Sequence, residues 1–277
     1  MFEKVSRSWG LVKASASVLR ADKELMVFPV LSSLATLLVL ATFALPVFAF
    51  KLFDHGFNAV GAVLGFLFYF CQYTVIVFFN SALVGAATIR LEGGDPTVSD
   101  GLRAARSRLP AILGYAAIAA TVGVILKSLK DRDNNIVVRM IGSGLGVAWT
   151  LATFLVVPVL VNRDVGPIDA LKESVALLKK TWGENAIGHV GIGAAFGLIT
   201  FVLVAIGVGS AFLAWQAAPA AGIAVAAAFV VALLVLGVVQ SALSGIYAAA
   251  LYRYAVARET PPAFRGLALE SAFAPKR

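Results

Sequence analysis

Long apolar runs, separated by short charged segments, dominate the hydropathy pattern of this chain. A membrane-spanning helix needs about 20 apolar residues, with a range of about 17 to 25. Six runs meet this requirement, so the pattern predicts an all-α fold, a polytopic membrane helical bundle with six transmembrane helices. The expected spans are residues 28–50, 60–89, 110–126, 136–161, 186–213 and 220–251. We expect one membrane domain over residues 1–277, with an N-terminal amphipathic segment at 1–27 and a cytoplasmic tail at 252–277.

A second pattern occurs before the first, third and fifth spans, where apolar residues recur on one helix face beside basic residues. These apolar positions are Val5, Trp9, Val12, Ala16 and Leu19; Val98, Leu102, Ala105 and Leu109; and Leu171, Val175, Leu178 and Trp182. Gly101-Leu102-Arg103 and Ala170-Leu171-Lys172 each follow an aspartate and precede a pair of spans. The chain is therefore predicted to contain three repeats of an interfacial amphipathic helix plus a transmembrane hairpin. Independent amphipathicity of short basic loops is the alternative.

The distribution of Lys and Arg predicts the orientation of the spans. Of these residues, 18 lie in the N-terminal segment, the loops after the second and fourth spans, and the tail, whereas 5 lie on the other side. Basic residues concentrate on the cytoplasmic side of membrane proteins, so both termini are expected in the cytoplasm. The charged fraction is only 14% and the net charge is +8. No loop forms a sizeable basic domain, which argues against nucleic acid as a partner.

Three short segments resemble a known family. They are Phe2-Glu-Lys-Val-Ser-Arg-Ser-Trp9, Phe28-Pro29 at the first span, and Phe78-Phe-Asn-Ser-Ala-Leu-Val-Gly85 late in the second. They are similar to an uncharacterised prokaryotic family of six-span integral membrane proteins, described only as a domain of unknown function. The resemblance covers nearly the whole chain and implies a multi-pass protein of the bacterial or archaeal cytoplasmic (inner) membrane. It implies no activity and no active residues.

The expected spans contain no Asp or Glu. Ion-coupled transporters usually carry buried carboxylates or broken helices near the bilayer midplane, so active transport is disfavoured. The two histidines, His55 and His189, are too far apart for a zinc-protease helix, and the serines of the spans have no histidine at matching depth. The sole cysteine, Cys71, lies in an apolar run. We therefore expect no enzyme activity, no catalytic residues, no cofactor and no metal.

Two groups of polar residues lie within the spans. They are Gln72, Asn80 and Ser81 in the second span, and Gln240, Ser241 and Ser244 in the sixth. They either line a polar path or form hydrogen bonds between helices. The segment Arg90-Leu-Glu-Gly-Gly-Asp-Pro96 is interpreted as a helix-ending turn, with Ser99 or Asp100 capping the next helix.

Basic and small residues supply two further sets of candidates. Contacts with anionic headgroups are expected for Lys13, Arg103, Arg106, Lys172, Lys179 and Lys180. Packing faces, at which small residues allow helices to approach closely, are expected at Gly85, Gly142, Gly146 and Gly245.

The function favoured by these features is that of a non-enzymatic membrane scaffold or accessory subunit, which associates with itself or with a membrane protein partner. One alternative is a channel or facilitator for a small solute, with its pore along the polar span residues. Another is a lipid-handling protein that binds anionic phospholipids of the bilayer. The sequence leaves these alternatives open.

Overall fold

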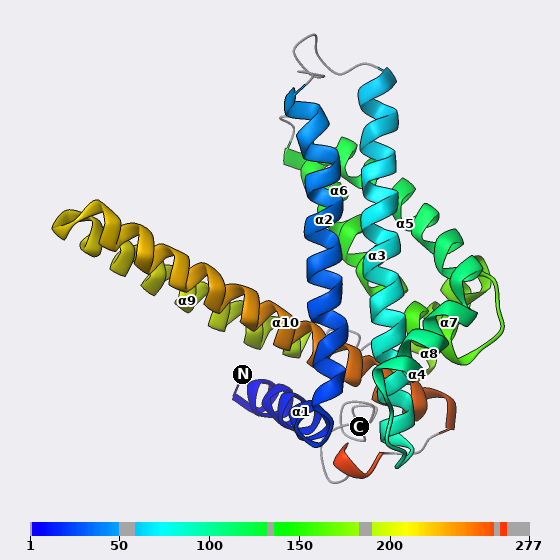
Figure 1. Ribbon diagram of the computed structural model, residues 1–277. Coiled ribbons are helices and arrows are strands. Elements are labelled where there is room, and N and C mark those ends of the chain that lie inside the picture. Colours follow the sequence, from blue (N-terminus) through cyan, green and yellow to red (C-terminus); the bar gives the residue numbers. More distant parts are fainter. Residues whose placement is uncertain (1, 50–58, 132–135, 183–189, 258–260, 265–277) are drawn as a thin grey trace.

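The computed structural model describes residues 2–49, 59–131, 136–182, 190–257 and 261–264, and nearly all of these residues are helical (Figure 1). None of them belongs to a β-strand. Six helices are long and apolar enough to cross a bilayer. The protein is therefore an all-α, multi-pass membrane protein, as the sequence predicts.

Long helices form three hairpins. The long helices are α2 (Val27–Ala49), α3 (Ala59–Leu91), α5 (Leu109–Asp131), α6 (Ile136–Thr153), α9 (Val190–Ala217) and α10 (Pro219–Ala257). The shorter elements are α1 (Phe2–Ala21), η1 (Lys23–Met26), α4 (Val98–Ser107), α7 (Val156–Asn162), α8 (Pro167–Trp182) and η3 (Pro262–Phe264). Helices α1, α4 and α8 each precede one hairpin, which is the element order expected for three repeats. The repeat itself stays a prediction.

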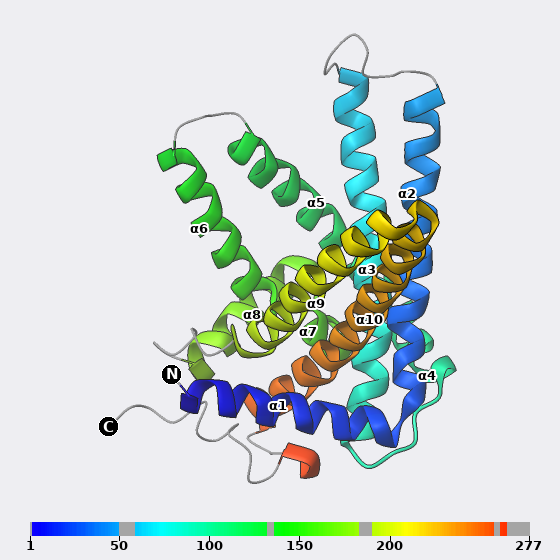
Figure 2. The same cartoon turned by 90° about the vertical axis from the view of Figure 1, so that its left-hand side faces the viewer.

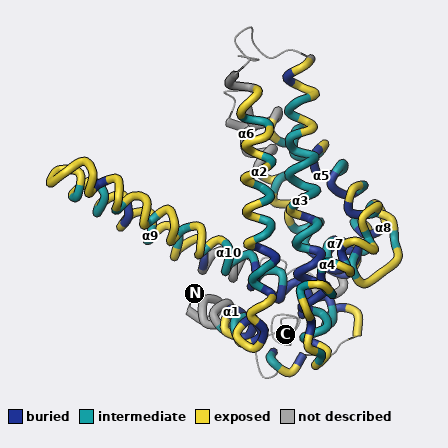
Figure 3. The backbone as a smooth tube through the Cα atoms, viewed as in Figure 1, coloured by how far each residue is buried: buried dark blue, intermediate teal, exposed yellow. Residues whose placement is uncertain are grey.

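The hydrophobic core lies at one end of the molecule, which we call the base and define by α1, α4, α7, α8 and the ends of the hairpins packed against them. Figure 3 shows buried backbone concentrated there. The largest fully buried side chains come from all three hairpins, from α7 and from the two short 3-10 helices, and among them are Leu25, Phe28, Leu83, Ile112, Leu155, Leu160, Ile246, Leu251 and Phe264. The three hairpins are therefore held together mainly at the base.

Close helix contact at the base depends on small residues. A Cβ on Gly101 of α4 would lie 2.4 Å from the Phe28 ring and 2.6 Å from the Ala82 carbonyl oxygen. A Cβ on Gly245 of α10 would lie 2.4 Å from the Leu83 side chain. Neither position has room for a larger residue without displacement of its neighbours.

Away from the base the hairpins separate, and α9–α10 leans away from the other two (Figures 1 and 2). The main contacts of α9 are with α10 and α1. Large apolar side chains on this hairpin are exposed, among them Phe201 and Phe212. Helices α9 and α10 are apolar all round, which is typical of a membrane span whose surface faces lipid or another helix.

The fourth span differs from its prediction as one continuous helix over 136–161. Helix α6 ends at Thr153 and α7 begins at Val156, so the span is broken at Phe154 and Leu155. Pro158 accounts for the position of the break, since it lacks an N–H and its ring excludes the carbonyl four residues earlier, that of Phe154. The other predicted spans each correspond to one long helix.

Candidate functional site

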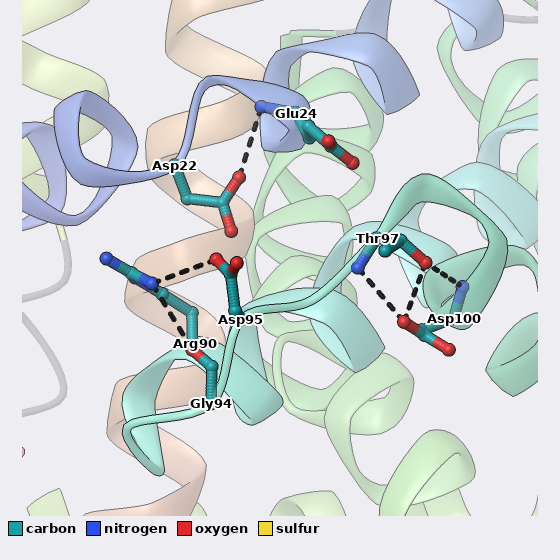
Figure 4. A network of polar contacts seen from close by, with 7 residues as sticks. All are labelled: Asp22, Glu24, Arg90, Gly94, Asp95, Thr97 and Asp100. Atoms are coloured by element: carbon teal, nitrogen blue, oxygen red, sulfur yellow. Dashed lines mark hydrogen bonds and ion pairs between the residues drawn. The ribbon is translucent and has the colours of Figure 1, made fainter.

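Polar side chains of the described residues gather at the base, where they connect the shorter helices to the hairpins. Two carboxylates at the start of the first hairpin act as helix caps (Figure 4). Asp22 accepts a hydrogen bond from the Glu24 amide at 3.1 Å, and Glu24 accepts one from the Val98 amide at 2.9 Å, at the first residue of α4. Burial raises the pKa of Asp22 above 3.8, against the effects of the Glu24 amide and the Arg90 charge. The first hairpin is thereby linked to α4.

The turn between α3 and α4 is the helix-ending turn that the sequence predicts (Figure 4). Gly93 has φ of +90°, a left-handed conformation that glycine adopts without strain. Arg90 closes the turn, because its guanidinium contacts the Gly94 carbonyl and the Asp95 carboxylate, each at 3.3 Å.

The residue that caps α4 is Thr97, so the prediction of Ser99 or Asp100 as the cap is wrong. The Thr97 hydroxyl accepts from the Asp100 amide at 3.3 Å, and the Asp100 carboxylate accepts from the Thr97 amide at 3.0 Å. This reciprocal arrangement is a capping box. Asp100 also accepts from the Thr97 hydroxyl at 2.7 Å, and this bond lowers the pKa of the carboxyl below 3.8.

Ion pairs connect the three hairpins at the base. Arg253 of α10 pairs with Glu92, after α3, at 3.1 Å, and Arg163 after α7 pairs with Glu173 of α8 at 3.0 Å. Arg108 pairs with Asp164, which joins the start of α5 to the turn after α7. Arg163 also donates to the Tyr252 hydroxyl, and this bond raises the pKa of the guanidinium.

The most exposed ion pairs of the base contribute little free energy of folding. Asp164 has 95% and Asp95 has 97% of its side chain exposed. Pairs of this kind contribute about 0–1 kcal/mol each, because water screens them and long side chains lose freedom. The pairs fix which elements meet, whereas apolar packing supplies most of the stability of the base.

The break between α6 and α7 is bridged by Ser174 of α8. The Ser174 hydroxyl accepts from the Leu155 amide at 3.1 Å and donates to the Ala152 carbonyl at 2.7 Å. The side chain is fully buried. A buried backbone group without a partner is costly, so this one hydroxyl stabilises both sides of the break. Sequence reasoning missed Ser174, although Pro158 was a signal that the span would break.

The predicted polar span residues do not form one connected path. The Gln72 side-chain amide donates to the Thr36 carbonyl at 3.3 Å, which joins α3 to α2. Ser81 is fully buried, and its hydroxyl has no partner among the described residues. No hydrogen bond connects Asn80 to Gln240 within the described part of the chain. Asn80, Gln240, Ser241 and Ser244 are half-buried, so their role in a polar path stays a prediction.

The predicted packing glycines fall into two groups. Gly85 faces Ala104 of α4, where a Cβ would lie 2.7 Å away, and Gly245 faces Leu83, so both pack within the chain. Gly146 has open space around it. The surroundings of Gly142 lie outside what the structure describes, as does His189.

The predicted headgroup contacts lie at the base. Lys13 of α1, Arg103 and Arg106 of α4, and Lys172 and Lys179 of α8 are exposed. The side chain of Lys180 lies outside the described part. No group of three or more His, Cys, Asp or Glu suited to a metal ion occurs among the described residues.

Comparisons with known proteins give one finding. Residues 59–261, from the start of α3 to just beyond α10, match the model of a family described as a family of unknown function, DUF6159. No curated protein and no solved structure matches the chain. The match covers well over half of the sequence and includes five of the six long apolar helices. The chain belongs to the DUF6159 family.

Proposed function

We propose that the protein is a non-enzymatic scaffold or accessory subunit of a prokaryotic inner membrane, and that it binds another membrane segment along α9–α10. The base then lies at the cytoplasmic face, together with both termini. The partner is a second copy of the chain or a different membrane protein.

The observation that carries this proposal is that the outer part of α9–α10, beyond the base, leans away from the other hairpins. Phe201 of α9 is 71% exposed, and Leu234 of α10 is 57% exposed. Glycines also open onto this surface, since nothing lies within 4 Å of a Cβ built on Gly209 or Gly237. In lipid, helices associate through close packing at small residues, because lipid chains already satisfy the hydrophobic effect. A hairpin with open glycines, whose outer part leans away from the other hairpins, is suited to binding a further helix.

The base also favours a scaffold over a pore through one chain. The spans converge there, and their meeting point is filled by fully buried side chains such as Leu83, Leu160 and Ile246. A solute path through the monomer would have to cross this packed layer. A channel would therefore need either a rearranged base or an assembly of several chains.

The test uses native mass spectrometry on protein extracted gently from its own membrane. Wild type is expected as a discrete oligomer or with a stoichiometric partner. Gly209→Leu and Gly237→Leu are expected to release the bound chain, because a bulky side chain prevents close approach. Gly65→Leu is the matched control, since Gly65 has equally open space but lies on α3. A wild-type protein that is always a bare monomer, or equal loss in all three variants, would overturn the proposal.

A further inference from the structure

Acidic side chains at the base are all engaged within the chain. Each carboxylate whose side chain is described there accepts a hydrogen bond or pairs with a cation: Asp22, Glu24, Glu92, Asp95, Asp100, Asp164, Asp169 and Glu173. The base carries more cations than these carboxylates can neutralise. The surplus positive charge has to be balanced from outside the chain.

The cations of α4 and α8 divide into two classes. Arg103 pairs with Asp100 at 3.2 Å, and Lys172 pairs with Asp169 at 3.1 Å, each three residues apart near the start of its helix. Arg106, later on α4, and Lys179, later on α8, are exposed and have no anionic partner among the described residues. The division follows the spacing of the acidic residues, because Arg103 and Lys172 each lie three residues after an aspartate, whereas Arg106 and Lys179 do not.

Each of the three helices α1, α4 and α8 has one such cation near its C-terminal end. Arg20 lies in the last turn of α1 and Arg106 in the last turn of α4. Lys179 lies in the last four residues of α8. Arg106 stands three residues before α5, Arg20 seven residues before α2, and Lys179 eleven residues before α9. Arg20 is exposed as well and has no anionic partner in the described part.

We propose that Arg20, Arg106 and Lys179 each bind the headgroup phosphate of an anionic phospholipid. A cation without an internal partner binds phosphate without first breaking an ion pair. Exposed apolar surface follows along the chain, at Val30 of α2 after Arg20 and at Leu109 of α5 after Arg106, where acyl chains can lie. A soluble phosphate would use the charge alone, whereas a lipid uses both features. This inference does not depend on the scaffold proposal.

The experiment compares two double variants with the same change in charge on the same two helices. Arg106→Gln with Lys179→Gln removes the unpaired cations, and Arg103→Gln with Lys172→Gln removes the paired ones. Purified proteins are titrated with phosphatidylglycerol or phosphatidylcholine, and bound lipids are counted by native mass spectrometry. A juxtamembrane cation strengthens anionic-lipid binding about fivefold, so the first variant should bind phosphatidylglycerol roughly 30-fold more weakly. The second should stay within about threefold of wild type.

Equal weakening in both variants would overturn the proposal, because general charge rather than pairing would then control binding. Binding of phosphatidylcholine as tight as that of phosphatidylglycerol would also overturn it. So would displacement of the lipid by inorganic phosphate at equal concentration, which would indicate a site for the free anion. If the first variant does not fold, Arg20→Gln on α1 supplies the same comparison against Arg103→Gln alone. The oligomer is read in the same spectra, so failure here is distinguishable from failure of the scaffold proposal.

Discussion

Removal of the Ser174 hydroxyl tests whether α8 stabilises the broken fourth span. In Ser174→Ala, the buried Leu155 amide loses its acceptor and the Ala152 carbonyl loses a donor at 2.7 Å. A buried polar group left without a partner costs about 1–3 kcal/mol. We expect a loss of about 2 kcal/mol in the free energy of unfolding, which corresponds to roughly a 30-fold change in the folding equilibrium constant.

The measurement is equilibrium unfolding in mixed detergent micelles, followed by far-UV circular dichroism. Ser210→Ala is the matched control, because the Ser210 hydroxyl donates to the Ile206 carbonyl of its own helix at 2.8 Å. Its removal breaks no contact between helices, so we expect the free energy of unfolding to change by less than about 0.5 kcal/mol. If the two variants lose the same free energy, Ser174 does not bridge the break, and Pro158 alone determines its geometry.

Three further predictions concern the base. Gly101→Ala should lower stability by about 1–3 kcal/mol in the same unfolding assay, because its Cβ would contact the Phe28 ring and the Ala82 backbone, whereas Gly65→Ala should not. The fold lowers the pKa of Asp100, so the ionised carboxylate stabilises the protein fully above pH 3.8, the pKa of the unfolded state, and this stabilisation is lost as the pH falls through the lower pKa of the folded state. Asp100→Asn should remove this part of the pH dependence of Tm. Glu24→Ala removes the acceptor of the first α4 amide, so hydrogen exchange there should accelerate about fivefold, for a loss of about 1 kcal/mol. Unchanged exchange would show that water replaces the carboxylate at no cost.

The periodicity of the sequence was sufficient to predict the helices. Span lengths and amphipathic faces depend on each residue and its near neighbours, and the membrane requires every backbone group in a span to be hydrogen-bonded locally. For this reason the predicted helices over 28–50 and 60–89 lie within two residues of α2 and α3. The predicted turn at Arg90–Pro96 is also local, since its glycines and its closing guanidinium lie within a few residues of one another.

The site depended on contacts that no local pattern contains. Ser174 lies about twenty residues from the backbone groups it bridges, so its sequence neighbourhood shows only an amphipathic helix. Thr97 and Asp100 are close in sequence, yet only the backbone conformation decides which of the neighbouring polar residues caps α4. The sequence predicts packing faces at both Gly85 and Gly146, yet in the structure Gly85 faces α4 and Gly146 faces open space.

The sequence by itself determined that this chain is a six-span helical membrane protein with a shorter helix before each hairpin, because hydrophobicity and helical periodicity act over one or two turns. Only the tertiary structure decided that the hairpins meet at a packed base, and that α9–α10 leans away from the other hairpins beyond it. Those outcomes depend on which distant surfaces fit together. Helices of nearly uniform hydrophobicity do not differ enough in sequence to specify that choice.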